Sequence, residues 1–147
     1  MEFALRQFLC SICLLPIAFP AIAGHFYVAS YGLDNYDVAA EIGDLVSEGF
    51  TAEFKSTDYA IVAISNHARL GDDNLCNAVV GVSKRAASGQ SEMVPWWRFT
   101  GTIINRQSGS MNVDAVRKCK AEAIRSAVEN LMSVSPKEIR AKSEGRL

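Results

Sequence analysis

VDAVRKCKAEAIRSAVENL, residues 113–131, is the stretch of sequence that most strongly constrains the fold. Apolar side chains recur in it at the spacing of one helix face, and charged side chains take the opposite face. The apolar stripe comprises Val113, Val116, Ala123, Ile124, Ala127 and Leu131. We therefore expect an amphipathic helix here, with Cys119 at the border of its stripe and Lys120 reaching from the stripe to water.

Sheet strands are predicted upstream of this helix. Residues 59–65 are apolar in both alternating sets, which is typical of a central strand or one covered on both sides. Residues 76–83 alternate between apolar and polar, with Cys76 in the inward set. Residues 97–103 are expected to send Trp97 and Phe99 inward. Polar connections are predicted at 67–74 and 84–93.

The N-terminal part of the chain predicts a strand, a helix and a short strand. The first strand is placed at 26–31 and the short one at 50–54, and the helix is expected to begin near Asp34 and stop before Gly49. This stretch of pattern, residues 26–54, resembles the first half of the peptidoglycan-binding SPOR modules of bacterial envelopes. The second helix of those modules has no counterpart after Ile64.

These elements together predict an α+β fold. We expect a mostly antiparallel sheet of about five strands with two main helices packed on one face, stapled by one disulfide. The sequence is divided into a signal peptide at 1–23, a single domain at 24–134 and a charged tail at 135–147. In the tail, Ser135-Pro136-Lys137-Glu138 resembles a capping box and favours a short helix.

The first 23 residues have the pattern of an export signal. Arg6 supplies a positive charge, an apolar run spans 8–19, and Ala21-Ile22-Ala23 offers small residues for cleavage before Gly24. An uncleaved anchor is the alternative, but the run is shorter than a membrane span and contains prolines. We expect a periplasmic or secreted protein with no membrane span after cleavage.

Cleavage would change the cysteine count. Cys10 and Cys13 would leave with the signal, so that only Cys76 and Cys119 remain. Two cysteines in an oxidising compartment predict one disulfide, with a pair of free buried thiols as the alternative. Neither C-x-x-C spacing nor a reactive thiol is expected, so the bond is interpreted as structural.

The charge of the chain is almost balanced. Removal of Arg6 and Glu2 from the 15 basic and 16 acidic residues leaves 14 and 15. This balance gives no electrostatic case for nucleic acid or for an anionic membrane as partner.

The sequence carries no recognisable catalytic or metal-binding motif. The sequence has neither a G-x-S-x-G turn nor an S-x-x-K pair, and Asp72 and Asp73 beside Gly71 have the pattern of turn formers. No cofactor is expected. His67 shares a loop with those acids without a metal-site spacing, and His25 is a weak copper candidate only if cleavage leaves it second in the chain.

Residues with binding chemistry are concentrated between Lys84 and Thr100. Trp96, Arg98 and Thr100 are predicted to share one strand face, where they could stack on a sugar or form a protein hot spot. The alternative is that Trp96 only covers a sheet edge. The remaining candidates are Lys84 and Arg85 in the polar connection at 84–93, and His67 in the one at 67–74.

The predicted function is non-catalytic. We expect a small exported protein of the bacterial envelope that binds a protein or a cell-wall polymer, for example as an inhibitor or immunity-type protein. Two alternatives remain open: an envelope enzyme whose site is assembled only in three dimensions, and a subunit of a surface assembly, which an exposed apolar patch would indicate.

Overall fold

One sheet with strand order β1-β2-β3-β4 forms the centre of the molecule. The computed structural model describes residues 25–85, 93–105 and 109–143; the predicted signal peptide and residues 86–92 and 144–147 lie outside them. The strands are β1 (Val28–Tyr31), β2 (Tyr59–Leu70), β3 (Asp73–Lys84) and β4 (Phe99–Asn105). β1 runs parallel to β2, and the β2–β3 and β3–β4 pairs are antiparallel.

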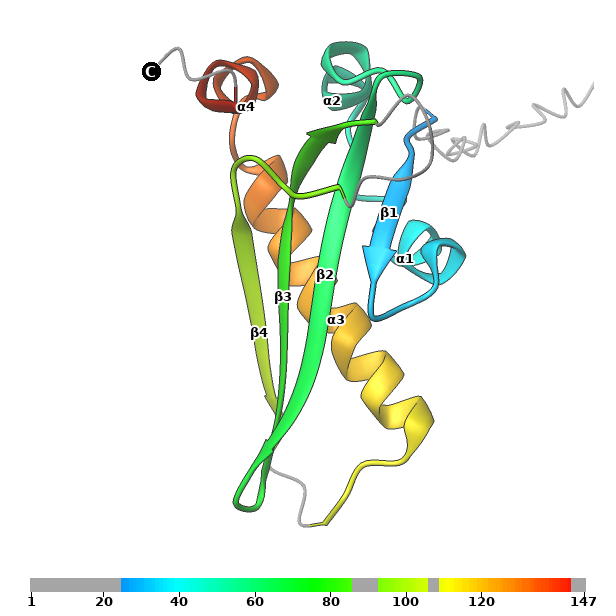
Figure 1. The fold of residues 1–147 in the computed structure, drawn as a ribbon, viewed down its shortest axis with the longest axis vertical. Coiled ribbons are helices and arrows are strands. Elements are labelled where there is room, and N and C mark those ends of the chain that lie inside the picture. Colours follow the sequence, from blue (N-terminus) through cyan, green and yellow to red (C-terminus); the bar gives the residue numbers. More distant parts are fainter. Residues whose placement is uncertain (1–24, 86–92, 106–108, 144–147) are drawn as a thin grey trace, which may run out of the picture.

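Helices cover one face of this sheet. They are α1 (Asn35–Ile42), α2 (Glu48–Glu53), α3 (Val113–Met132) and α4 (Pro136–Ser143). Figure 1 shows α3 crossing behind β2 and β3, α1 beside it behind β1, and α2 and α4 at the end where β2 begins. The predicted α+β fold, with two main helices on one face of a mostly antiparallel sheet, is confirmed.

The predicted disulfide is also confirmed. Cys76 of β3 and Cys119 of α3 are joined with their Cα atoms 5.8 Å apart. Both residues are buried in the core between sheet and helix, because each occupies the inward position that its strand or helix periodicity predicted. The bond therefore ties the long helix to the middle of the sheet.

The prediction of a fifth strand at 50–54 is wrong, because residues 50–53 belong to α2 and Phe54 is its C-cap. Ser47 caps the helix, its hydroxyl oxygen accepting from the Phe50 amide at 3.2 Å. Phe50 and Phe54 stack with ring centroids 5.0 Å apart. Two aromatic residues four positions apart suit one helix face as well as one strand face, and the cap decides between them.

Two further boundaries differ from expectation. The first helix ends at Ile42 rather than just before Gly49. The polar connection predicted at 67–74 consists of the ends of β2 and β3, which pair up to Leu70 and Asp73 around a two-residue turn. Backbone pairing along both strands overrides the polar composition of this segment.

The long helix approaches β4 very closely at Gly101. A Cβ atom built on Gly101 would lie 2.1 Å from the Ala123 carbonyl oxygen and 2.7 Å from the Ala127 nitrogen. Both of these are backbone atoms of α3, which cannot move without moving the helix. The helix can therefore pack at this depth only because position 101 has no side chain.

Candidate binding surface

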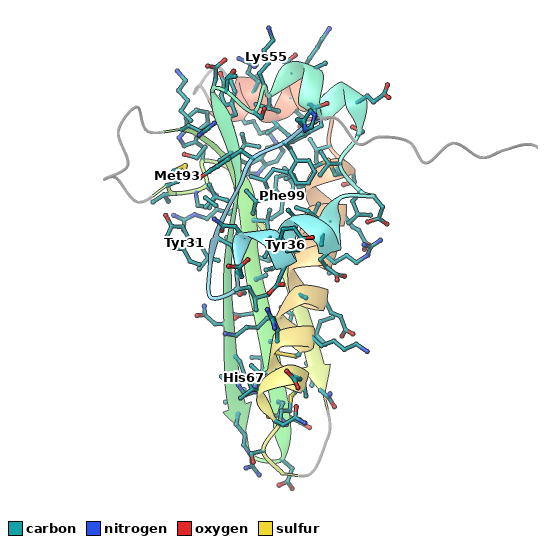
Figure 2. All side chains as sticks on the ribbon, turned by 90° about the vertical axis from the view of Figure 1, so that its right-hand side faces the viewer. Tyr31, Tyr36, Lys55, His67, Met93 and Phe99 are labelled. Atoms are coloured by element: carbon teal, nitrogen blue, oxygen red, sulfur yellow. A yellow bond between two sulfur atoms is a disulfide. The ribbon has the colours of Figure 1, made fainter. Side chains whose placement is uncertain are left out.

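The face of the sheet turned away from the helices is open over much of its length. We call it the outer face, and it consists of the outward residues of β2, β3 and β4. Its neighbours on the helix side, such as Cys76, Ala78 and Val80, are buried. In Figure 2 this face lies on the left, on the side of the labelled Tyr31 and Met93 and away from α3.

Strand register arranges the outer face in rows that run across the sheet. What we call the upper apolar row contains the apolar Ile64 and Val79 and ends in the polar Thr100 on β4, with Tyr31 beside it on β1. A middle polar row contains Asn66, Asn77 and Thr102, and a lower apolar row contains Ala68, Leu75 and Ile104. The members of a row lie directly opposite each other on paired strands, close enough for their side chains to touch. The face therefore alternates from apolar to polar to apolar.

The lower apolar row is strongly exposed. Ile104 retains 60% of its accessible surface, and Leu70, one step closer to the hairpin turn, retains 63%. Together with Ala68 and Leu75 they form a group that we call the tip patch. Scattered exposed aliphatic residues are normal, whereas a contiguous group on one sheet face indicates a contact surface.

A short segment covers the opposite end of the outer face. Residues 93–97 pass over Gly81, where an added Cβ would lie 2.2 Å from the Trp97 carbonyl oxygen and 2.7 Å from the Pro95 side chain. Met93 packs against Ala60 and Val62, and its amide donates to the Tyr31 hydroxyl at 3.0 Å. Among the described residues, this segment is what covers the outer face. It covers the end beyond the upper apolar row and leaves the rows described above uncovered.

The hairpin turn at the tip carries Asp72 and Asp73, with Arg69 beside them donating its Nε–H to the Gly71 carbonyl at 3.0 Å. Gly71 has a φ of 62° and is the first of the two residues between the paired Leu70 and Asp73, the pattern of a type II′ turn. Asp72 and Asp73 sit at this end of the sheet, and Figure 1 shows the hairpin at the far end of the molecule, beside the segment that leads into α3. The tip thus presents carboxylates next to exposed leucine.

Three of the predicted binding residues gather at the other end of the sheet. The Trp96 amide donates to the Val82 carbonyl at 3.0 Å, which places Trp96 beside the end of β3, where Lys84 and Arg85 follow. Trp96 is 40% exposed, and its ring meets Tyr59 edge-on at 6.3 Å. The Arg85 guanidinium lies 4.1 Å from the Tyr27 ring centroid. This end is therefore aromatic and cationic.

The other predicted binding residues lie apart from that group. Arg98 is exposed just before β4, and Thr100 belongs to the upper row of the outer face. His67 lies on the helix side of β2, where its Nε2 and the Asn74 Oδ1 are 3.1 Å apart. The structure thus brings Trp96, Lys84 and Arg85 to one end and leaves His67 near the other, on the opposite face.

A shallow cleft of about 460 Å³ separates the start of α1 from the start of α3. Leu33, Val113 and Val116 line it together with the ion pair between Arg117 and Asp37. The Lys120 amine, which the sequence predicted to reach water, donates to the Gly32 carbonyl at 3.3 Å. Neither His67 nor Asp72 lines this cleft.

Arg125 joins α3 to the end of α1. Its guanidinium donates to both carboxylate oxygens of Asp44 at 2.8 and 2.6 Å and to the Glu41 carbonyl at 2.7 Å. The hydrogen bonds from Arg125 lower the pKa of the Asp44 carboxyl below its usual value. The folded state thus favours the ionised carboxyl.

This pair predicts a pH-dependent contribution to stability. A depressed pKa in the folded state stabilises the protein above the ordinary carboxyl pKa, and the gain is lost as pH falls through the folded pKa. We expect Asp44→Asn to lower the melting temperature at pH 7 and to have little effect near about pH 2. Thermal unfolding at both pH values checks this, and an equal deficit at both would contradict it.

No group of three or more His, Cys, Asp or Glu side chains within residues 25–85, 93–105 and 109–143 is arranged to hold a metal ion. The copper site suggested for His25 also requires Gly24, which lies outside the described residues. That suggestion therefore stays a prediction.

The tip patch is the feature that the sequence reasoning missed. The dipeptide Gly71-Asp72 between two strand-like runs is a hairpin signal. It would have extended the first strand past His67 to the turn and started the second strand directly after the turn. Once the strands are extended, alternation alone places Ala68, Leu70 and Leu75 on one face. Ile104 joins them only through the pairing of β3 with β4.

Comparisons with known proteins add little. No protein-family model matches the chain, and no curated protein matches it. Among solved structures, the crystal structure of a "putative lipoprotein" from Caulobacter crescentus CB15 aligns with 82% of this chain and 88% of that chain, at 11% identity and a TM-score of 0.36. A TM-score this low establishes neither a common fold nor a common function.

Proposed function

We propose that this chain is an exported, non-catalytic binding protein of the bacterial envelope, and that the outer face of its sheet is the binding surface. The observation that carries the proposal is the tip patch, a contiguous exposed group of aliphatic side chains beside a polar row. An antiparallel sheet face left to water is usually polar, so exposed aliphatic residues here favour a contact with another macromolecule.

The compartment is supported separately. A buried disulfide between Cys76 and Cys119 fits a protein of the envelope or a secreted one, because the cytoplasm keeps such thiols reduced. Within the part of the chain that the structure describes, no helix is both long and apolar enough to span a membrane. Periplasm and medium remain equal alternatives in this proposal.

A subunit of a surface assembly is the second candidate function, and the same patch favours it. For the inhibitor or immunity-type role, the support is the exposed Leu70 at the hairpin end, which could contact a cleft on another protein. In every one of these roles the outer face or its tip makes the contact.

A photo-crosslinking amino acid placed at Thr102 tests the proposal. Thr102 is exposed in the middle of the outer face, so a bound macromolecule would lie within reach of it. Expressed in the native host and illuminated, the Thr102 variant is expected to form a specific covalent adduct, identified by mass spectrometry. The added substitution Ile104→Asp is expected to abolish that adduct.

The matched control carries the same crosslinker at Glu122, which is exposed on α3 on the opposite side of the molecule. Equal adduct patterns from Thr102 and Glu122 would mean that the outer face has no preferred occupant. Retention of the adduct in the presence of Ile104→Asp would exclude the tip patch as part of the surface.

A further inference from the structure

We propose that the occupant of the outer face is a second copy of this chain, packed sheet against sheet about a two-fold axis. The inference rests on the proposed function, namely that the outer face is a binding surface, and it names the partner. Three features support it: the order of the rows, the charges at the two ends of the face, and the place where the face is covered.

The row order is self-complementary. A two-fold axis along the middle row, lying between the two sheets and perpendicular to the strands, would place the Asn66 and Asn77 row of one copy over the same row of the other. Amide side chains both donate and accept, so like can pair with like. The same axis places each upper apolar row over the partner's lower apolar row, so that Val79 faces Leu75 and Ile64 faces Ala68.

The charges along the face are complementary under the same axis. Asp73 lies four residues from Asn77 toward the tip, and Arg98 lies four residues from Thr102 in the opposite direction. At a strand rise of about 3.3 Å per residue, both lie about 13 Å from the axis. Asp73 of one copy therefore comes to the level of Arg98 of the other.

Within the described residues, these charges take part in no ion pair. Across residues 25–85, 93–105 and 109–143, the ion pairs involve neither Asp72, Asp73, Lys84 nor Arg98. The turn that carries Asp72 and Asp73 and the cationic end of a single chain lie at opposite ends of its sheet (Figure 1). A second chain running in the opposite direction would bring them together.

The covered end limits the overlap of the two copies. Stacked sheets lie about 10 Å apart, so a segment already lying over Gly81 occupies that space. The partner's exposed Leu70 would come to the level of Gly81 and would meet Met93 and Val94 of that segment rather than the sheet itself. Val94 is itself 49% exposed. A surface that matches itself in this way is isologous, as in most homodimers.

Light scattering coupled to gel filtration, together with sedimentation equilibrium, tests the inference on the mature disulfide-bonded protein. We expect the wild-type chain to be a dimer and Ile104→Asp to be a monomer with an unchanged far-UV spectrum. The control Val113→Asp, at a position 84% exposed on α3, is expected to remain a dimer. A monomeric wild type, or a dimer that survives Ile104→Asp, would overturn the proposal.

Charge reversal gives an independent test that does not depend on the patch. Asp73→Arg and Arg98→Asp are each expected to raise the dimer dissociation constant about tenfold, because each creates two like-charge contacts at the rim. The double variant D73R/R98D is expected to return to the wild-type value, since each copy again meets the opposite charge. Failure of the double variant to recover would exclude this orientation.

The two proposals fail in distinguishable ways. If the crosslinker at Thr102 captures a different protein and the wild type is a monomer, the outer face is a binding surface and the second copy is excluded. If neither an adduct nor a dimer is found, the binding surface itself is excluded.

Discussion

Gly101→Ala is expected to destabilise the protein by about 3 kcal/mol, at the upper end of what overpacking costs. The new Cβ would lie 2.1 Å from the Ala123 carbonyl oxygen and 2.7 Å from the Ala127 nitrogen, so α3 must lift away from β4. Lifting the helix exposes the side chains that pack between α3 and the sheet, including Ile124 and Val128 of the helix itself. Thermal unfolding followed by circular dichroism should show a melting temperature lower by about 10 °C.

Gly49→Ala is the matched control. Gly49 lies in α2, and a Cβ built there has no neighbour within 4 Å. Alanine in a helix is favoured over glycine by about 0.5–1 kcal/mol, so this variant should be slightly more stable than the wild type. A Gly101→Ala protein that melts within about 2 °C of the wild type would show that α3 does not pack on β4 at this depth.

Removal of the disulfide by the double substitution C76A/C119A is expected to cost about 4 kcal/mol in the chain-entropy model. The bond closes a loop with a sequence separation of 43 residues, so its loss frees a large part of the unfolded chain. Both cysteines are buried, so the alanines also leave a small cavity between sheet and helix. Urea unfolding of the variant should show a midpoint well below that of the wild type.

Thiol counting supplies the control for that experiment. The oxidised mature protein should take up no thiol reagent until it is both denatured and reduced, because Cys76 and Cys119 are bonded and lie in the core. Uptake of two equivalents without reduction would mean that the bond is absent. A variant as stable as the wild type in urea would mean that the bond is present but contributes nothing to folding.

Local patterns that agreed with tertiary packing were predicted correctly from sequence. The periodicity of residues 113–131 predicted α3. The count of two cysteines in an oxidising compartment predicted the disulfide, and the inward place of Cys76 and the border place of Cys119 agreed with it. Residues 50–54 were assigned wrongly because Phe50 and Phe54 fit either periodicity, and the cap at Ser47 favours the helix.

The binding role of the candidate residues stays a prediction. The sequence grouped Trp96 with Arg98 and Thr100, whereas the hydrogen bond from the Trp96 amide to Val82 places Trp96 near Lys84 and Arg85, which sequence spacing does not reveal. The tip patch was missed because a polar composition between His67 and Asn74 was interpreted as a loop. Polar residues on a hairpin that projects into water are as compatible with a strand as with a loop.

The sequence by itself determined the fold class of this protein through an amphipathic helix, alternating strands and two cysteines placed to bond between them. These follow from periodicity, which each segment carries alone. The export signal stays a prediction. Only the tertiary structure decided which side of the sheet stays open and which residues share a row on it. Leu75 and Ile104 are 29 positions apart in the chain and become neighbours through strand pairing, a long-range property that no single segment encodes.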